Sequence, residues 1–233
     1  MRLCILGDIH GNYLALNSVL KSIKEMGGST LLIAGDFVGY YFWPAKVFDL
    51  LRGWDVVAIR GNHDRMFERA KSDPTFLRNL EERYGSGLRV ALDELDSETA
   101  DWLINLPNSL EYSTNEGKIL LCHGSPWDGD EYVYPDASEE SLARYADLAV
   151  RWVIQGHTHY PMRKDVGQVT VINPGSVGQP RDRNPGAQWA VLDTVSARVD
   201  YFCEHYDVRE IISEARKRNP DIPYLANVFV TSE

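Results

Sequence analysis

Short apolar runs in this chain repeatedly lead into Asp, Asn or His, usually after glycine, and this pattern constrains the fold more than any other feature. The first run, residues 3–6, is followed by Gly7, Asp8 and His10. Residues i and i+2 of an extended segment share a face, so Asp8 and His10 can point to one place. A lone Asp-x-His pair is a weak signal because such pairs arise by chance. Four later apolar runs end in the same kinds of residue, and this repetition strengthens it.

Helix-spaced apolar residues separate the first three of these runs. Between residues 13 and 26 they recur at helical spacing, and Gly27 with Gly28 ends the pattern. A buried strand is predicted over 31–34, a helix begins at Pro44, and a β-branched run follows over 56–59. This alternation of strand and helix predicts an α/β fold with a sheet that is at least partly parallel.

The remainder of the chain continues the fold without linkers, repeats or low-complexity tracts. Residues 65–106 are mostly helical and form a cover, and 127–135 are an acidic, aromatic loop. Helices are expected over 139–149 and 208–217, and an extended tail after Pro220. Further strands are predicted over residues 118–122, 151–154, 169–172, 190–192 and 199–202. We therefore expect a single domain spanning residues 1–233.

The charge balance limits the classes of partner. The chain has 233 residues, a formal net charge of −10 and a sequence pI near 5.1. This acidity argues against bulk nucleic-acid binding and against binding to anionic membranes. It does not exclude a small anionic substrate, because bound cations can reverse the local field. The sequence is silent on oligomeric state and leaves a homo-oligomer open.

The cysteines and the apolar segments indicate the compartment. Cys4, Cys122 and Cys203 are odd in number and widely spaced, so they do not form a disulfide framework. No run approaches the ~20 apolar residues of a membrane span, and the N-terminal residues lack the pattern of a signal peptide. We expect a cytoplasmic protein.

The polar residues after the strand-like runs are candidate metal ligands. Polar groups that follow parallel strands gather at one edge of the sheet, so five segments would converge there. These segments contain five of the six histidines, whereas His205 has no accompanying motif and is interpreted as structural. Imidazole, carboxylate and amide ligands without thiolate suit Mn, Fe, Zn, Co or Ni. The set is too large for one four-coordinate ion and is sufficient for two ions that share a carboxylate.

The motifs, taken together and in order, resemble those of the calcineurin-like metallophosphoesterases. They are Gly7-Asp8-Ile9-His10-Gly11-Asn12, Gly35-Asp36, Gly61-Asn62-His63-Asp64, His123-Gly124 and Gly156-His157-Thr158-His159. The segments 37–40 and 173–181 resemble the small prokaryotic branch, often described as predicted phosphodiesterases or as diadenosine-tetraphosphatase-like. The resemblance implies a four-layer α/β sandwich in which helices flank two mixed β-sheets.

The resemblance also implies a role for each site residue. Asp36 would bridge two divalent metal ions, with Mn preferred and Fe, Zn, Ni or Co as alternatives. His63 would stay off the metals and act as general acid or stabilise the phosphoryl charge, during in-line attack by a metal-activated hydroxide. The first metal would be held by Asp8, His10 and His159, and the second by Asn62, His123 and His157.

The chain departs from some relatives just after Asp36. Protein phosphatases and dinucleoside-tetraphosphate hydrolases of the superfamily carry an acid and an arginine where this chain has Gly39 and Tyr40. The departure favours a phosphodiesterase or a broad phosphatase acting on a small phosphate ester or nucleotide. The alternatives are a phosphomonoesterase, a protein phosphatase, and a non-catalytic metal-binding scaffold for protein interaction.

Two further features have an open interpretation. Arg181 and Arg183 could reach a substrate phosphate, but a purely structural or solvated arginine is equally expected. The aromatic residues 40–43 could line a substrate cleft or a partner surface, although packing in the core is the simpler interpretation. Cys122, beside His123, is interpreted as inert packing.

Overall fold

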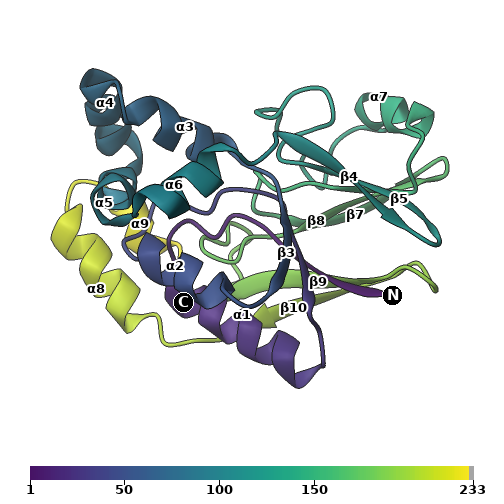
Figure 1. Cartoon of the computed structure of the whole chain (residues 1–233), viewed down its shortest axis with the longest axis horizontal. Helices are drawn as coiled ribbons and strands as arrows, with labels where there is room; N and C mark the ends of the chain where they lie inside the picture. The colour runs from purple at the N-terminus through teal and green to yellow at the C-terminus, as the bar shows by residue number, and fades with distance from the viewer. Residues whose placement is uncertain (231–233) are drawn as a thin grey trace.

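A computed structural model describes residues 1–230, in which two five-stranded sheets pack face to face between helical layers (Figure 1). In the first sheet the order is β10-β9-β1-β2-β3; β1, β2 and β3 are parallel, and β9 runs antiparallel to both β1 and β10. Its strands are β1 (Arg2–Leu6), β2 (Thr30–Ile33), β3 (Asp55–Ala58), β9 (Ala187–Asp193) and β10 (Arg198–Glu204).

The second sheet is also mixed and has the order β4-β5-β6-β8-β7. Here β5, β6 and β8 are parallel, whereas the edge strands β4 and β7 are antiparallel to their neighbours. Its strands are β4 (Ser109–Thr114), β5 (Gly117–Cys122), β6 (Trp152–Ile154), β7 (Pro161–Val166) and β8 (Val169–Pro174). The two mixed sheets confirm the predicted fold class.

Side-chain alternation along the buried strands divides the core into layers. In β1, Leu3 and Ile5 belong to the cluster between the two sheets, together with Ile119 and Leu121 of β5. The alternate residues Cys4 and Leu6 join the cluster beneath the helices. Successive side chains of a strand point to opposite faces, so a fully apolar strand contributes to both layers.

The helices form the two outer layers (Figure 1). Most cover the first sheet, and in α1 the buried side chains recur at helical spacing. A short helical segment, α7 (Glu139–Leu142) followed by a 3₁₀ turn (Ala143–Asp147), covers the second sheet. The remaining helices are α1 (Tyr13–Glu25), α2 (Pro44–Leu51), α3 (Asn62–Ala70), α4 (Pro74–Tyr84), α5 (Gly87–Glu94), α6 (Ser97–Ile104), α8 (Arg209–Arg218) and α9 (Tyr224–Asn227).

Two local predictions need correction, and two strands were missed. The helix expected over 139–149 is α-helical only to Leu142, because the following turn tightens to 3₁₀ geometry and buries Tyr145. The tail after Pro220 is not simply extended, since α9 packs Leu225 and Ala226 into a cluster with Tyr41 and Phe42. Strands β4 and β7 were not predicted, because edge strands with half-exposed faces lack a continuous apolar run.

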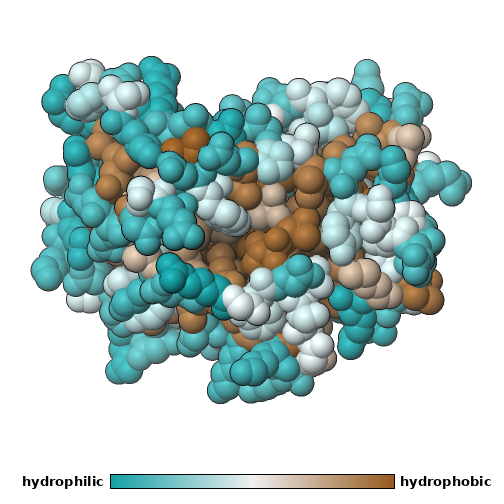
Figure 2. Space-filling view, viewed as in Figure 1, coloured by the Kyte–Doolittle hydropathy of each residue, from teal (hydrophilic) through white to brown (hydrophobic). Residues whose placement is uncertain are grey.

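The face shown in Figure 2 is mainly hydrophilic, and its apolar residues gather mostly in the middle, around the edge strand β3. Within residues 1–230, none of the helices combines the length and the apolar character needed to cross a membrane.

Candidate metal centre

The site lies at the carboxyl ends of the central parallel strands of both sheets. Asp8 and His10 follow β1, Asp36 follows β2, and His123 follows β5. Asn62 and His63 begin α3 just after β3, and His157 and His159 follow β6. The structure thus brings together all the residues that the sequence pattern predicted to converge.

One half of the cluster contains Asp8, His10, Asp36 and His159, whose potential ligand atoms lie within 4.8 Å of one another. The Nε2 atoms of His10 and His159 are 3.2 Å apart. His159 Nε2 is 3.4 Å from Asp8 Oδ1, and His10 Nε2 is 3.6 Å from Asp36 Oδ2. All four side chains are buried, so their polar atoms converge on one water-poor point.

The other half is centred on Asn62. Its Oδ1 lies 2.8 Å from His123 Nε2 and 3.0 Å from His157 Nδ1. His123 Nε2 is also 3.3 Å from Asp36 Oδ2, the same oxygen that faces His10. Asp36 therefore lies between the two halves, where one carboxylate oxygen can serve both.

Backbone carbonyls determine which nitrogen of each ring faces the cluster. His10 Nδ1 is 3.1 Å from the Val38 carbonyl, and His159 Nδ1 is 2.6 Å from the Gln179 carbonyl. A carbonyl can only accept, so each Nδ1 carries the proton and donates it. Burial lowers the pKa of both histidines well below the usual value, so the rings are neutral. Their Nε2 lone pairs therefore point into the cluster, as in histidine ligands oriented by a carbonyl.

This arrangement fits a bound cation. Two neutral Nε2 lone pairs that face each other at 3.2 Å repel unless a positive charge lies between them. Among the described residues, the buried Asp8 Oδ2 and His157 Nε2 also have no hydrogen-bond partner, although buried polar atoms are normally satisfied. Carboxylate, imidazole and amide donors are ligands that divalent transition metals accept. The residues present thus fit divalent metal binding.

The electrostatics of the cluster favour positive charge as well. Burial raises the pKa of Asp8 to about 7, and the charge of Asp36 acts in the same direction. For His123, burial alone would lower the pKa, but the Asp36 carboxylate and its hydrogen bond raise it to about 9. The field that favours a proton on His123 also favours a cation.

Five of the candidate ligand side chains project from a strained backbone. Asp8, His10, Asp36, His157 and His159 all have positive φ, between 51° and 67°. This left-handed region is uncommon for residues other than glycine, and strain of this kind clusters at functional sites. The loops after β1, β2 and β6 are thus held in conformations that aim these side chains inward.

Asp64, the last residue of the motif Gly61-Asn62-His63-Asp64, organises the loops around the cluster, a role that was not predicted. Its buried carboxylate accepts the backbone N–H groups of Asp36, Phe37, Val38 and Gly61, at 2.8–3.3 Å. Gly61 is required by close approach, since a Cβ there would lie 2.1 Å from Asp36 Oδ1. The place of Asp64 in that motif is the only signal of this role in the sequence.

His63 lies beside the cluster without joining its ligand atoms. Its ring centroid is 4.8 Å from that of His10, and its backbone N–H donates to Asp36 Oδ1 at 2.8 Å. Burial lowers the pKa of the His63 ring to about 4. Gly39 packs against His63 so closely that a Cβ would lie 2.5 Å from Nδ1. The buried Nδ1 accordingly has no partner among the described residues.

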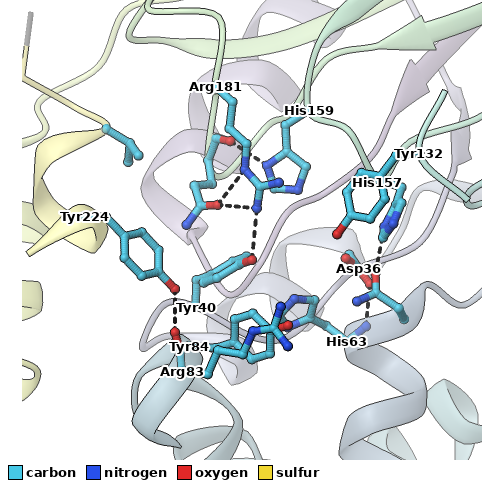
Figure 3. A pocket seen from close by; sticks show the side chains of 13 residues that line it. Asp36, Tyr40, His63, Arg83, Tyr84, Tyr132, His157, His159, Arg181 and Tyr224 are labelled. Atoms are coloured by element: carbon cyan, nitrogen blue, oxygen red, sulfur yellow. Dashed lines mark hydrogen bonds between the residues drawn. The ribbon is translucent and has the colours of Figure 1, made fainter. Parts of the chain in front are cut away.

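A cavity of about 490 Å³ opens over the cluster (Figure 3). Its volume is in the range of small-molecule sites. It is lined by Asp36, Tyr40, Asn62, His63, Arg83, Tyr84, Tyr132, His157, His159, Gln179, Arg181, Tyr224 and Val228. No sequence motif indicated that Arg83, Tyr84, Tyr132 or Tyr224 would line a site, and Gln179 was noted only as part of the segment 173–181. These residues come from α4, the loop over 127–135, the loop after β8 and α9, and they meet only in the folded chain.

The structure distinguishes between members of the aromatic segment 40–43 and between the two arginines, Arg181 and Arg183. Tyr40 lines the cavity, whereas Tyr41 and Phe42 pack in the core with α8 and α9. Arg181 lines the cavity over the cluster and also a neighbouring one, whereas Arg183 is exposed and lines only the neighbouring one.

The histidine and the cysteines interpreted as structural are not among the candidate ligands and do not line the cavity. His205 is exposed. The three cysteines are free, with Cys4 and Cys122 buried and Cys203 half-buried. Burial raises the pKa of the Cys122 thiol, which is consistent with inert packing.

Comparison with known proteins supports the same interpretation. Residues 1–197 match the family described as the calcineurin-like phosphoesterase superfamily domain. The uncharacterised protein MJ0912 of Methanocaldococcus jannaschii is 28% identical over 226 residues, covering 89% of each chain. Phosphodiesterase YfcE of Escherichia coli K12 is 26% identical over 206 residues, covering 83% of this chain and 88% of YfcE.

A solved structure shows the likeness of fold. The metallophosphoesterase of Sphaerobacter thermophilus superposes with a TM-score of 0.79 and 25% identity, over 98% of this chain and 99% of that one.

Proposed function

From the premise that this chain belongs to the calcineurin-like phosphoesterase superfamily, we propose that it is a metal-dependent phosphodiesterase acting on a small phosphate ester or nucleotide. The observation that carries the proposal is the pair of neutral Nε2 lone pairs, of His10 and His159, that face each other 3.2 Å apart, and His159 lines the cavity. This arrangement is understandable as a cation site, and the cavity above it has room for a small substrate.

The geometry supports a site for two metal ions around one shared carboxylate. Asp36 would serve both ions, because its Oδ2 faces His10 on one side and His123 on the other. Mn is the preferred metal, with Fe, Zn, Ni or Co as alternatives that the same ligands accept. Asp8, His10 and His159 would hold the first ion, and Asn62, His123 and His157 the second.

Bound divalent cations lower the pKa of a coordinated water and neutralise charge on a phosphoryl group. The protein's own contribution includes His63, which borders the cavity beside His10. Because burial lowers its pKa to about 4, the ring is neutral at neutral pH. This favours a role as an N–H donor to a phosphoryl or leaving-group oxygen over a role as a preformed general acid.

The preference for a diester has two supports. YfcE, a relative named as a phosphodiesterase, spans most of the chain. In addition, Gly39 and Tyr40 replace the acid and arginine found in protein phosphatases and dinucleoside-tetraphosphate hydrolases of the superfamily. The scaffold alternative is disfavoured because His63 and the complete candidate ligand set are present.

The test compares bis-p-nitrophenyl phosphate with p-nitrophenyl phosphate, using protein of defined Mn content. We expect hydrolysis of the diester at a higher kcat/KM than the monoester. A higher value for the monoester would identify a phosphomonoesterase. Metal binding without hydrolysis of either compound, or of a panel of nucleotides and phosphopeptides, would favour the scaffold.

Two broader proposals accompany this function. Residues 1–233 are proposed as one domain, supported by the packing of Leu225 in α9 against Tyr41 and Phe42. A cytoplasmic location is proposed from the free cysteines, which suit a reducing compartment.

A further inference from the structure

We propose that Arg181 is the phosphate-binding arginine of this site and that Tyr40 and Gln179 hold it above the metal cluster. The inference rests on the proposed function and names the group that would bind a non-bridging oxygen of the scissile phosphodiester. Figure 3 shows the Arg181 side chain pointing into the cavity, between His159 and Tyr40.

Neutral groups hold the guanidinium on one side only. Its Nη2 donates to the Tyr40 hydroxyl at 2.9 Å and to Gln179 Oε1 at 3.0 Å, and its Nε donates to the same Oε1 at 3.3 Å. A guanidinium has five N–H donors. The two on Nη1 have no protein partner among the described residues and are free to bind a ligand.

No described carboxylate lies within ion-pair distance of Arg181. Its hydrogen bonds with described residues end on neutral oxygens, and the Asp8 carboxylate of the cluster acts on its charge only from a distance. A half-buried cation that lines a cavity without an anionic partner is suited to an anionic ligand.

The two residues that hold Arg181 also position the metal cluster. The Gln179 carbonyl accepts from His159 Nδ1, while its side chain accepts from Arg181. The Tyr40 ring packs on His10 and His63, with centroid distances of 4.5 and 4.7 Å. The same residues therefore fix the position of the guanidinium relative to the candidate metal ligands, as recognition of a phosphate at the cluster requires.

The origin of Arg181 in the chain explains why the arginine expected after Asp36 can be absent. Tyr40 stands where some relatives carry that arginine, and the Tyr40 hydroxyl receives the Arg181 side chain from the loop after β8. A cationic group thus contacts the residue at that position from a segment 141 residues away.

The experiment compares Arg181→Gln with Arg183→Gln in Mn-loaded protein. Arg183 provides a matched control, because it lies in the same loop, is exposed and faces a different cavity. Three quantities are measured for each variant: Mn content, affinity for inorganic phosphate by calorimetry, and kcat/KM for bis-p-nitrophenyl phosphate.

Loss of a charge-assisted hydrogen bond should weaken phosphate binding and lower kcat/KM by about 10- to 100-fold in Arg181→Gln. Mn content should be unchanged, and Arg183→Gln should stay within about twofold of the wild type. Arg181→Lys should recover part of the loss because it restores the charge without the planar fork. Tyr40→Phe should lower both phosphate affinity and kcat/KM by about 3- to 10-fold.

Two results would overturn the assignment. One is an Arg181→Gln protein with full Mn content whose phosphate affinity and kcat/KM stay within about twofold of the wild type. The other is equal loss in Arg181→Gln and Arg183→Gln, which would indicate a diffuse charge effect. Failure of the proposed function is distinguishable, because the wild type itself would then hydrolyse neither test ester.

Discussion

Two parts of the site are built on different principles. The floor is the buried cluster of candidate ligands with His63, and the walls are the other residues that line the cavity above it. The floor residues, such as His10 and Asp36, are buried and follow strands of the central sheets. The walls come from a loop and from helix ends, and the side chains of Tyr132 and Tyr224 are 54% and 38% exposed. Ligand orientation on the floor depends on backbone groups, such as the Val38 carbonyl that accepts from His10.

This contrast separates chemistry from selectivity. A cluster held by buried backbone hydrogen bonds keeps its geometry, which catalysis at a metal site requires. Exposed wall residues can change without disturbing that geometry, and they are the groups that a substrate's ester arms would contact. We therefore expect floor substitutions to affect metal content and kcat, and wall substitutions to affect KM.

The largest effect is expected at the shared carboxylate. Asp36→Asn, or removal of the metals by a chelator, should lower phosphodiesterase activity by at least about 10³-fold, because metal ions contribute several kcal/mol to the transition state. The exposed Asp93→Asn is the matched control and should keep wild-type activity. Metal content by mass spectrometry and hydrolysis of bis-p-nitrophenyl phosphate are the measurements. Full activity in metal-free protein would show that the floor does not act through bound metal ions.

The next effect tests the group beside the ligands. His63→Gln should lower kcat by about 10²–10³-fold, the usual cost of removing one hydrogen-bond donor to developing negative charge, and should leave metal content unchanged. The exposed His205→Gln provides the control. Wild-type turnover by a metal-replete His63→Gln protein would exclude the proposed role, and loss of the metals would reassign the residue as a ligand.

A glycine pair can separate backbone strain from damage to the floor. Gly39 and Gly53 both have positive φ, 118° and 89°, but only Gly39 would place a Cβ against His63 and His10. Alanine at either position should lower the free energy of unfolding by about 1 kcal/mol or more. Gly39→Ala alone should also lower kcat, by about tenfold, because it displaces the rings. Denaturant titration and steady-state kinetics measure the two effects.

The smallest effect is expected at the wall. Tyr224→Ala should raise KM for an aryl diester by about 2- to 10-fold, the value of an aromatic contact, with kcat and metal content unchanged. Tyr201→Ala is the control, since Tyr201 is equally exposed at 38% but lies on β10, outside the cavity. A fall in kcat without a rise in KM would show that walls and floor are not separable.

The sequence could predict the floor because its residues carry local signals. Each follows an apolar strand, often after glycine, and the order of these motifs identified the family. The walls carry no such signal. Arg83, at the end of α4, and Tyr224, at the start of α9, are distant along the chain, yet the Tyr224 hydroxyl donates to the Arg83 carbonyl at 3.0 Å.

By itself, then, the sequence determined the layered α/β fold and the set of groups gathered at the strand ends, because the period of apolar residues and the strand-to-loop motifs are local properties. Only the tertiary structure decided which nitrogen of each histidine faces the cluster, that Asp64 secures four backbone N–H groups, and that Arg181 lies over the site while Arg183 does not. Such features depend on contacts between distant segments, whose geometry is set by packing and hydrogen bonding across the whole fold.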